Sequence, residues 1–273
     1  MVLNANYYSN CLRRFVPFTA MIPMDVPDSL LKKDIPETKK FRTLYLLHGY
    51  TGYCDDWVLG SRIQEFAAQH NLAVVMPSGG NSFYVDNQIG EKYGEFVGRE
   101  LVEFTRRLFP LSHRREDTLV GGLSMGGYGA LRNGLKYADT FGTIIALSSA
   151  LITDAVAASH GDTKDSPESK EYYISVFGDP DRLLGSDKDP KALAKKLKDS
   201  GVSIPRIYMA CGTEDFLLQP NRDMHETLEK LGIDVTYEEG PGIHDWNFWN
   251  PYIERALDWF DPKSPDGISR VRE

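Results

Sequence analysis

The chain has 273 residues, of which 41% are hydrophobic, 26% charged and 11% aromatic, a composition that excludes an intrinsically disordered protein. Its 24 glycines and 15 prolines follow no period, which excludes a collagen-like chain. The net charge of −8 argues against a nucleic-acid-binding surface, because such surfaces need basic residues to displace counterions from phosphates.

The cysteines and the apolar runs indicate the compartment. Cys11, Cys54 and Cys211 cannot all pair within one chain, and they lack the close spacing of a zinc site. No apolar run reaches the roughly 18 residues that a bilayer span requires. The apolar stretch after Arg13-Arg14 is interrupted by prolines and followed by acidic residues, unlike a secretory signal. We expect a cytoplasmic protein with free thiols and with neither a membrane nor a nucleic acid as its partner.

From residue 41 onward, short apolar runs alternate with amphipathic stretches, which predicts strands that alternate with helices. Strands are predicted at residues 41–47, 72–76, 118–121, 142–147, 206–210 and 235–237. Helices are predicted at residues 61–69, about 97–108, 125–136, 190–198, 222–231 and 246–260. Because this alternation needs crossover connections, the fold class is α/β, with a mostly parallel central sheet flanked by helices. Residues before 41 are expected to add antiparallel strands at one edge, and residues 1–273 to form a single domain.

One long connection interrupts the alternation. More than 50 residues rich in Asp, Lys, Gly and Ser separate the strand that ends near Ser148 from the strand that starts at Arg206. Connections of this length inside compact domains are commonly lids or binding loops. We therefore expect residues 151–205 to form a cap-like insertion that covers the functional site and sets its specificity.

A candidate nucleophile lies between a predicted strand and a predicted helix. The residues Gly122-Leu123-Ser124-Met125-Gly126 match Gly-x-Ser-x-Gly, and this context is that of a nucleophile elbow, in which a strained turn exposes the serine hydroxyl. The flanking glycines are required where a Cβ atom would collide with the neighbouring elements. The alternative is a glycine-rich turn without chemistry. A phosphate-binding loop is disfavoured, because no Lys-Ser/Thr pair follows.

A serine hydroxyl needs a base, and the sequence offers six histidines. Five lie in predicted helices, in polar stretches or at the end of an early strand: His70, His225, His113, His160 and His48. For the two in helices, His70 and His225, we expect solvated faces. His244 lies between the last strand and the last helix, where an α/β sheet places its ligands, and is therefore the predicted base.

The acid should precede the histidine and follow a strand, in the order serine, acid, histidine. Glu214 and Asp215 both follow the strand at 206–210, and their spacing alone barely separates them. Either carboxylate would fix the imidazole tautomer and stabilise the imidazolium. For the oxyanion, we expect one N–H donor from Met125 and the other from Tyr50, in a loop that His48 shapes by its own hydrogen bonds.

These residues resemble a known family, and the likeness covers nearly the whole chain. It is carried by Leu46-Leu47-His48-Gly49 with Asp56-Trp57, by residues 77–84 and 122–130, by Cys211 to Phe216 and by His244-Asp245-Trp246. The chain is similar to the bacterial putative-esterase (esterase D-like) family of α/β-hydrolases, which includes S-formylglutathione hydrolases, tributyrin-type acetylesterases, cinnamoyl (feruloyl) esterases and mycolyltransferases. The resemblance implies an α/β-hydrolase fold and favours Asp215, the Asp of Gly-Thr-Glu-Asp-Phe, as the acid. Leu123 and Tyr128 replace histidines usual in S-formylglutathione hydrolases, so the chain looks closer to tributyrin-type and cinnamoyl esterases.

Aromatic residues near the predicted catalytic loops suggest an apolar substrate pocket. The candidates for substrate binding are Trp57, Phe83, Tyr84, Tyr128 and Trp246, although any one of them is as readily a core residue. We expect a serine carboxylesterase acting on small acyl esters, acetyl or short-chain and including those on sugars, with no metal or organic cofactor. The alternative is a feruloyl esterase, followed by an S-formylglutathione hydrolase, an acyltransferase and a non-catalytic binding protein. The expected partner is a small-molecule ester, and the sequence leaves room for a homo-oligomer.

Overall fold

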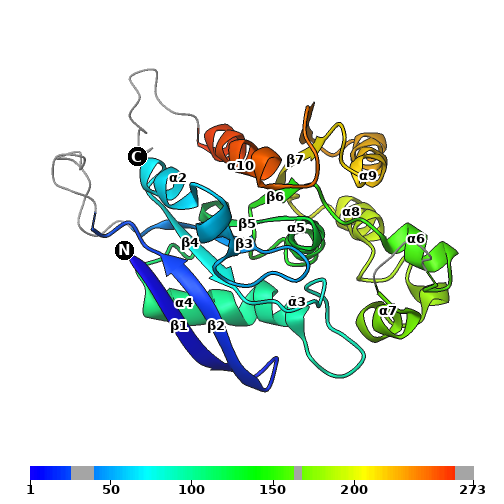
Figure 1. Ribbon diagram of the computed structural model, residues 1–273, viewed down its shortest axis with the longest axis horizontal. Coiled ribbons are helices and arrows are strands. Elements are labelled where there is room, and N and C mark those ends of the chain that lie inside the picture. The colour runs from blue at the N-terminus through cyan, green and yellow to red at the C-terminus, as the bar shows by residue number, and fades with distance from the viewer. Residues whose placement is uncertain (26–39, 163–167, 262–273) are drawn as a thin grey trace.

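The computed structural model describes residues 1–25, 40–162 and 168–261. Its centre is an eight-stranded sheet with the order β1-β2-β4-β3-β5-β6-β7-β8 (Figure 1). The strands are β1 (Val2–Ser9), β2 (Arg14–Met21), β3 (Arg42–Leu47), β4 (Leu72–Pro77), β5 (Thr118–Leu123), β6 (Thr143–Leu147), β7 (Arg206–Gly212) and β8 (Val235–Gly240). The predicted α/β class and the mostly parallel sheet are confirmed.

The two pairing modes divide the sheet as the sequence predicts. Strand β1 pairs with β2 and β2 pairs with β4 in antiparallel fashion, which adds a hairpin to one edge. From β4 to β8 every neighbouring pair is parallel. The carboxyl ends of β5, β6, β7 and β8 therefore lie along one edge of the sheet, and ligands of open α/β sheets bind beyond that edge.

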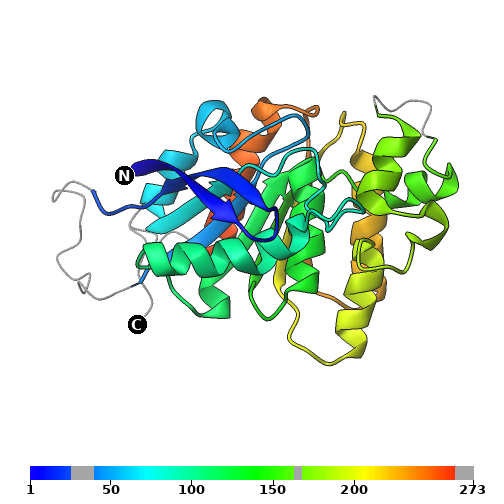
Figure 2. The same ribbon diagram turned by 90° about the horizontal axis from the view of Figure 1, so that it is seen from below.

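Helices cover both faces of the sheet (Figures 1 and 2). The main ones are α2 (Ile63–Gln69), α4 (Leu101–Leu108), α5 (Met125–Lys136), α8 (Pro190–Asp199), α9 (Leu218–Lys230) and α10 (Trp246–Phe260). Shorter elements are α1 (Asp56–Gly60), α3 (Tyr93–Glu95), the π-helical turn η1 (Phe96–Glu100), η2 (Arg115–Asp117), α6 (Thr153–Ala158), α7 (Lys170–Phe177) and η3 (Pro180–Arg182). The apolar sides of α4, α5, α8 and α9 share one core cluster, and those of α2 and α10 share another across the sheet. This division follows from strands whose side chains are buried on both faces.

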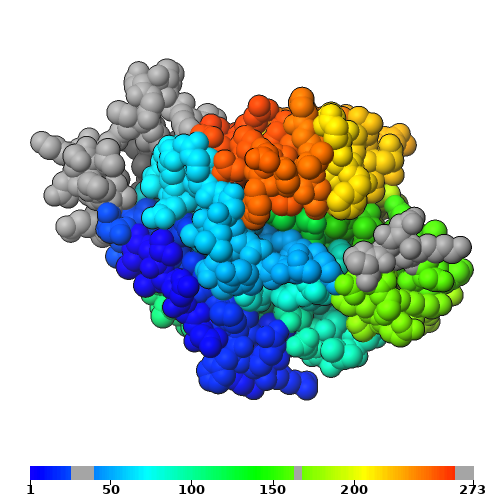
Figure 3. Space-filling model, viewed as in Figure 1, coloured from blue at the N-terminus to red at the C-terminus, as the bar shows by residue number. Residues whose placement is uncertain are grey.

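The insertion, residues 151–205, contributes to two parts of the molecule. Its last helix, α8, packs against α5 and belongs to the layer that covers the sheet. The preceding part, with α6, α7 and η3, forms the end of the molecule away from the N-terminus, where it is green in Figures 1 and 3. The insertion thus begins beyond the carboxyl edge of the sheet and ends as part of the helical layer.

Two expectations about helices are wrong in detail. The helix predicted at about 97–108 is divided, because residues 96–100 form a π-helical turn before α4 begins at Leu101. His70, expected on a solvated face, is only 1% exposed, and its ring lies near the carboxylates of Asp258 and Asp261. The chain after α2 turns inward at this histidine, which hydropathy alone does not reveal.

The described residues bear on two further expectations. No helix among them is both long and apolar enough to cross a membrane. All three cysteines lie in the described ranges and are free thiols. Burial is the main cause that raises the pKa of the Cys11 and Cys211 thiols, each to about 12, so both remain protonated at neutral pH.

Candidate active site

Ser124 occupies a strained turn between β5 and α5. Its φ is +55° and its ψ is −120°, a region that a residue with a side chain rarely adopts. The surrounding main chain holds this conformation: the Ser124 N–H donates to the Leu147 carbonyl at 2.9 Å, and the Ser124 carbonyl accepts from Tyr128 and Ala150. Such a residue persists only where its surroundings over-determine it, as at functional sites.

Glycines permit the close approach around this turn. A Cβ atom on Gly126 would lie 2.4 Å from the Leu47 carbonyl oxygen, and one on Gly122 would lie 2.5 Å from the Gly126 backbone. Gly49 also approaches the turn, since a Cβ atom there would lie 2.8 Å from Cδ1 of Leu123 and 3.5 Å, an ordinary contact distance, from the Cβ atom of Ser124. The loop after β3 is therefore in contact with the serine turn, and Tyr50 is the next residue of that loop.

An aspartate–histidine pair joins the loops after β7 and β8. The Nδ1–H of His244 donates to Oδ2 of Asp215 at 2.8 Å, and Oδ1 of Asp215 accepts from the Leu217 N–H at 2.8 Å. The Asp215 side chain is fully buried, whereas 18% of the His244 side chain is exposed. The imidazole is flanked by the rings of Phe216 and Trp249. With Nδ1 donating, Nε2 is left as the basic nitrogen.

The electrostatics keep Asp215 ionised. Burial by itself would raise the pKa of this carboxyl, but the hydrogen bonds from His244 and Leu217 outweigh it, so the pKa lies below its ordinary value. Glu214 has a different position. Its Oε2 accepts from the Gly242 N–H at 2.7 Å and from the Thr213 hydroxyl at 2.8 Å. The structure pairs His244 with Asp215, while Glu214 ties the two loops together.

The Ser124 hydroxyl and the two predicted oxyanion donors make no hydrogen bonds among the described residues. The Ser124 hydroxyl makes no hydrogen bond to His244 or to any other residue within 1–25, 40–162 and 168–261. Such contacts are commonly long until the reacting complex forms. The N–H groups of Tyr50 and Met125 likewise donate to no acceptor in the described ranges. For Met125 this is expected of the first residue of a helix.

His48 shapes the loop after β3, as the sequence predicts. Its Nδ1–H donates to the Gly49 carbonyl at 2.7 Å, and its Nε2 accepts from the Gly79 N–H at 2.8 Å. The Tyr84 hydroxyl donates to the His48 carbonyl at 3.0 Å. Burial lowers the pKa of His48, which keeps the ring neutral and Nε2 an acceptor. This histidine has both nitrogens engaged in structure.

Four of the five aromatic residues predicted to bind substrate belong to the core: Trp57, Phe83, Tyr84 and Tyr128 are each at most 5% exposed. Trp57 donates its indole N–H to the Leu47 carbonyl at 2.9 Å, behind the loop after β3. Trp246 is half-buried and packs edge to face on Trp57 and Trp249. These four residues therefore pack in the core, and of the five candidates Trp246 has the most accessible surface.

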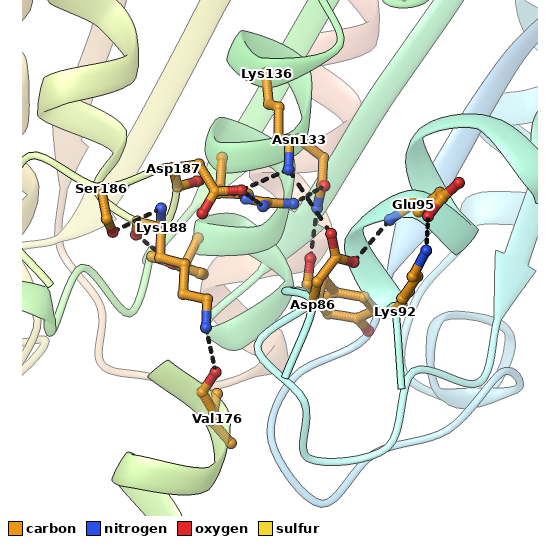
Figure 4. Close-up of polar contacts among 12 residues, drawn as sticks. Asp86, Lys92, Glu95, Asn133, Lys136, Val176, Ser186, Asp187 and Lys188 are labelled. Atoms are coloured by element: carbon orange, nitrogen blue, oxygen red, sulfur yellow. Dashed lines mark hydrogen bonds and ion pairs between the residues drawn. The ribbon is translucent and has the colours of Figure 1, made fainter. Parts of the chain in front are cut away.

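The insertion is fastened to α5 by polar side chains that composition does not reveal. Tyr128 donates its hydroxyl to the Lys188 carbonyl at 2.5 Å, and Arg132 donates to the Asp187 carbonyl and carboxylate at 2.9 and 2.6 Å. Lys136 also donates to the Asp187 carboxylate, and Figure 4 shows Asp187, Lys136 and Asp86 in one network. The three donors recur every four residues, so they share one face of the helix.

Asn221 and Glu168 are further contacts that the sequence analysis missed. The buried amide of Asn221 donates to the Ser149 carbonyl at 2.9 Å and accepts from the Ser149 N–H, which ties the start of the connection after β6 to α9. Glu168, two residues before α7, accepts a hydrogen bond from the Tyr50 hydroxyl. Neither residue belongs to a motif, and only their position in the fold reveals them.

No group of three or more histidine, cysteine or acidic side chains suited to a metal ion occurs in the part of the chain that the structure describes. The functional groups at the carboxyl edge of the sheet are instead the imidazole of His244, the carboxylate of Asp215 and the hydroxyl of Ser124. Chemically, this set can deprotonate a serine and transfer an acyl group to it.

Known proteins are similar to this chain in sequence and fold. A family model described as putative esterase matches residues 26–260. An acetyl esterase of Caldicellulosiruptor saccharolyticus is 52% identical over 264 residues, which cover 96% of this chain and 99% of the relative. FphF, a fluorophosphonate-binding serine hydrolase of Staphylococcus aureus, has a TM-score of 0.83 at 30% identity, with 95% of this chain and 98% of that chain covered. An S-formylglutathione hydrolase (FrmB) of the same species has a TM-score of 0.81 at 30% identity and the same coverage.

These likenesses extend over nearly the full length of both partners in each comparison, and they include the strands and loops that carry Ser124, Asp215 and His244. A ferulic acid esterase, at 22% identity and a TM-score of 0.73 over 95% of this chain and 97% of that chain, shares the fold. The family that the sequence motifs indicate is confirmed. The chain belongs to the putative esterase family of α/β-hydrolases.

Proposed function

We propose that this protein is a serine carboxylesterase that hydrolyses small acyl esters, acetyl esters foremost, through an acyl-enzyme on Ser124. The observation that carries the proposal is the buried Asp215–His244 pair at the same sheet edge as the strained Ser124. The 52% identity to an acetyl esterase supports the choice of acyl group.

The proposed reaction begins when the Ser124 hydroxyl oxygen attacks the ester carbonyl and His244 Nε2 takes its proton. The oxyanion that forms accepts hydrogen bonds from the N–H groups of Tyr50 and Met125. The C–O bond to the alcohol then breaks, and the alcohol leaves with the proton from His244. A water molecule repeats the sequence on the acyl-enzyme, which releases the acid and restores Ser124. Asp215 keeps Nδ1 protonated and stabilises the imidazolium throughout.

The proposal is tested with Ser124→Ala and p-nitrophenyl acetate. We expect kcat to fall on the order of 10³-fold or more, because the acyl-enzyme cannot form. A fluorophosphonate should add its mass to the intact wild-type chain and not to the variant. A variant that hydrolyses the ester at nearly the wild-type rate, or a wild-type chain that takes up no label, would overturn the proposal.

The substrate preference is a second measurement. The alternative of a feruloyl esterase rests on a fold likeness at 22% identity and on aromatic residues that the structure mostly buries. We therefore expect kcat/KM to be highest for acetyl and other short-chain esters, including acetylated sugars, and lower for methyl ferulate. The opposite order would establish the feruloyl specificity instead.

Location in the cytoplasm is part of the same proposal. It is supported by three cysteines that remain free thiols, two of them buried, because reducing compartments preserve such thiols. Detection of the native protein in the culture medium, with intact cells depleted of it, would contradict this location.

A further inference from the structure

The insertion reaches the loop after β3 through two tyrosines. The hydroxyl of Tyr50 donates to the carboxylate of Glu168, just before α7. The hydroxyl of Tyr172, in α7, donates to the Asn81 carbonyl at 2.6 Å, and the Asn81 side chain accepts from the Thr51 N–H at 2.8 Å. The two tyrosine rings meet edge to face with centroids 6.0 Å apart. Residues 50 and 51 are thus held from outside their own loop.

Tyr50 has a special place in this arrangement. Its backbone follows Gly49, which lies against Leu123 and Ser124 of the serine turn, and its own N–H has no acceptor in the described ranges. Its side chain extends away to Glu168. One residue therefore offers a backbone donor at the serine and a side-chain anchor on the insertion.

Glu168 also lies close enough to Tyr172 to affect the pKa of its phenol. Burial is the main cause that raises the pKa of Tyr172, and the nearby Glu168 carboxylate raises it further. The Tyr172 phenol therefore stays protonated at neutral pH and keeps its hydrogen bond to Asn81.

We propose that Glu168 is a positioning residue for the oxyanion hole: through the Tyr50 hydroxyl it fixes the backbone N–H of Tyr50 at the reacting carbonyl. This inference rests on the proposed function, because it takes Tyr50 as an oxyanion donor. It makes the insertion part of the catalytic geometry as well as of substrate selection.

The consequence for kinetics is specific. An oxyanion carries full charge only in the tetrahedral state, so a displaced donor weakens binding of the transition state and leaves ground-state binding nearly unchanged. A side chain that merely shapes the substrate pocket would alter KM instead. Removal of a whole donor costs about 10²–10³ in kcat, and a misplaced donor should cost a fraction of that.

The experiment compares Glu168→Leu, Glu168→Gln, Tyr50→Phe and the double variant Tyr50→Phe/Glu168→Leu with p-nitrophenyl acetate. Glu168→Leu and Tyr50→Phe should each lower kcat about tenfold with KM changed less than about twofold. Glu168→Gln should retain most activity, because its amide oxygen still accepts from Tyr50. The double variant should be no worse than the single ones, since both remove the same contact.

A transition-state analogue provides the second readout. A trifluoromethyl ketone forms a reversible tetrahedral adduct with the serine, so its inhibition constant should rise in parallel with the loss of kcat. Glu171→Gln is the matched control. Glu171 is exposed in the first turn of α7, and its substitution removes the same charge. The control should behave as wild type in both measurements.

The outcomes separate the two proposals. An inactive or unlabelled wild-type chain overturns the proposed function before any Glu168 variant is compared. An active wild type together with a Glu168→Leu variant of unchanged kcat overturns only the positioning role. A change confined to KM, or additive losses in the double variant, overturns it as well.

Discussion

Six parallel strands, β3 to β8, end at the same edge of the sheet, but the chain continues differently after β6 than after β5, β7 and β8. After β5, β7 and β8 it makes short turns that place Ser124, Asp215 and His244. After β6 it forms the insertion, residues 151–205, and returns only with β7. The short turns are fixed mainly by backbone hydrogen bonds, as at Ser124 and between Thr213 and Gly240.

The insertion is fixed by side chains instead. On one side, Tyr128, Arg132 and Lys136 of α5 hold Asp187 and Lys188, and on the other side Tyr50 contacts Glu168. Backbone hydrogen bonds persist through most substitutions, whereas side-chain contacts change with single residues. The difference indicates that the fold itself holds the catalytic turns, whereas replaceable side chains hold the insertion, including the Glu168–Tyr50 contact proposed to position an oxyanion donor.

The largest loss of activity should follow from substitution of Asp215, the acid in the turn after β7. Asp215→Asn should lower kcat on the order of 10³–10⁴-fold, because an asparagine favours the wrong imidazole tautomer. Glu214→Gln should change kcat less than about threefold, since Glu214 contacts only backbone and Thr213. Steady-state kinetics with p-nitrophenyl acetate make the comparison. Equal losses in the two variants would refute the assignment of Asp215 and show that the loop acts as a unit.

A smaller effect should follow from loosening the insertion. Arg132→Met removes a fully buried guanidinium that makes three hydrogen bonds, to the carbonyl and carboxylate of Asp187 and to the side chain of Asn133. We expect a loss of about 2 kcal/mol in the free energy of unfolding, below the range for a fully buried pair because Asp187 is partly exposed and keeps Lys136. Urea denaturation measures this loss.

Lys136→Met is the matched control for Arg132→Met, because its ammonium is partly exposed and should contribute under about 1 kcal/mol. Hydrolysis of p-nitrophenyl acetate should stay within about threefold of wild type in both variants, since main-chain contacts hold the catalytic turns. A collapse of kcat in Arg132→Met with the fold intact would show that chemistry and insertion are not separable.

The smallest expected effect is a pH-dependent change in stability that depends on Asp187. Burial by itself would raise the pKa of Asp187, but Lys136 and Arg132 outweigh it and leave the pKa below its ordinary value. A carboxyl whose folded-state pKa is lowered adds stability above its unfolded value of about 3.9, and this stability is lost as the pH falls below that value. Asp187→Asn should therefore destabilise the protein by at most about 1 kcal/mol at pH 7, because water screens the partly exposed group.

Urea denaturation of Asp187→Asn and of the wild type at pH 7 and near pH 3 shows whether the carboxylate charge of Asp187 stabilises the protein. The difference between variant and wild type should shrink at the lower pH. A difference that is the same at both values would mean that the carboxylate charge does not hold the insertion.

Much of the fold could be predicted from the sequence, because its boundaries carry local signals. Helices 125–136 and 246–260 are found with the predicted ends. The second begins after Asp245, whose carboxylate accepts from two backbone N–H groups of the first turn. The serine turn could be predicted because its glycines are needed wherever the same close approach occurs.

Contacts between distant segments could not be predicted. The burial of His70 depends on Asp258 and Asp261, which α10 brings to it from the far end of the chain. The Tyr50–Glu168 contact joins residues 118 positions apart, and nothing in either local sequence indicates it. Proximity in sequence predicts that the aromatic residues near the catalytic motifs bind substrate, yet packing buries most of them in the core.

The spacing of residues along α5 has a consequence for engineering. Ser124 immediately precedes this helix, and Tyr128, Arg132 and Lys136 follow at successive steps of four residues, so one rigid rod carries the nucleophile and the attachment of the insertion. The attachment to α5 uses few groups of the insertion: the Asp187 carboxylate and the backbone carbonyls of Asp187 and Lys188. Because Asp187 and Lys188 lie outside residues 151–186, a relative's segment could replace these residues and leave the helix after the reactive serine unchanged, provided that it supplies an acceptor for the Tyr50 hydroxyl in place of Glu168.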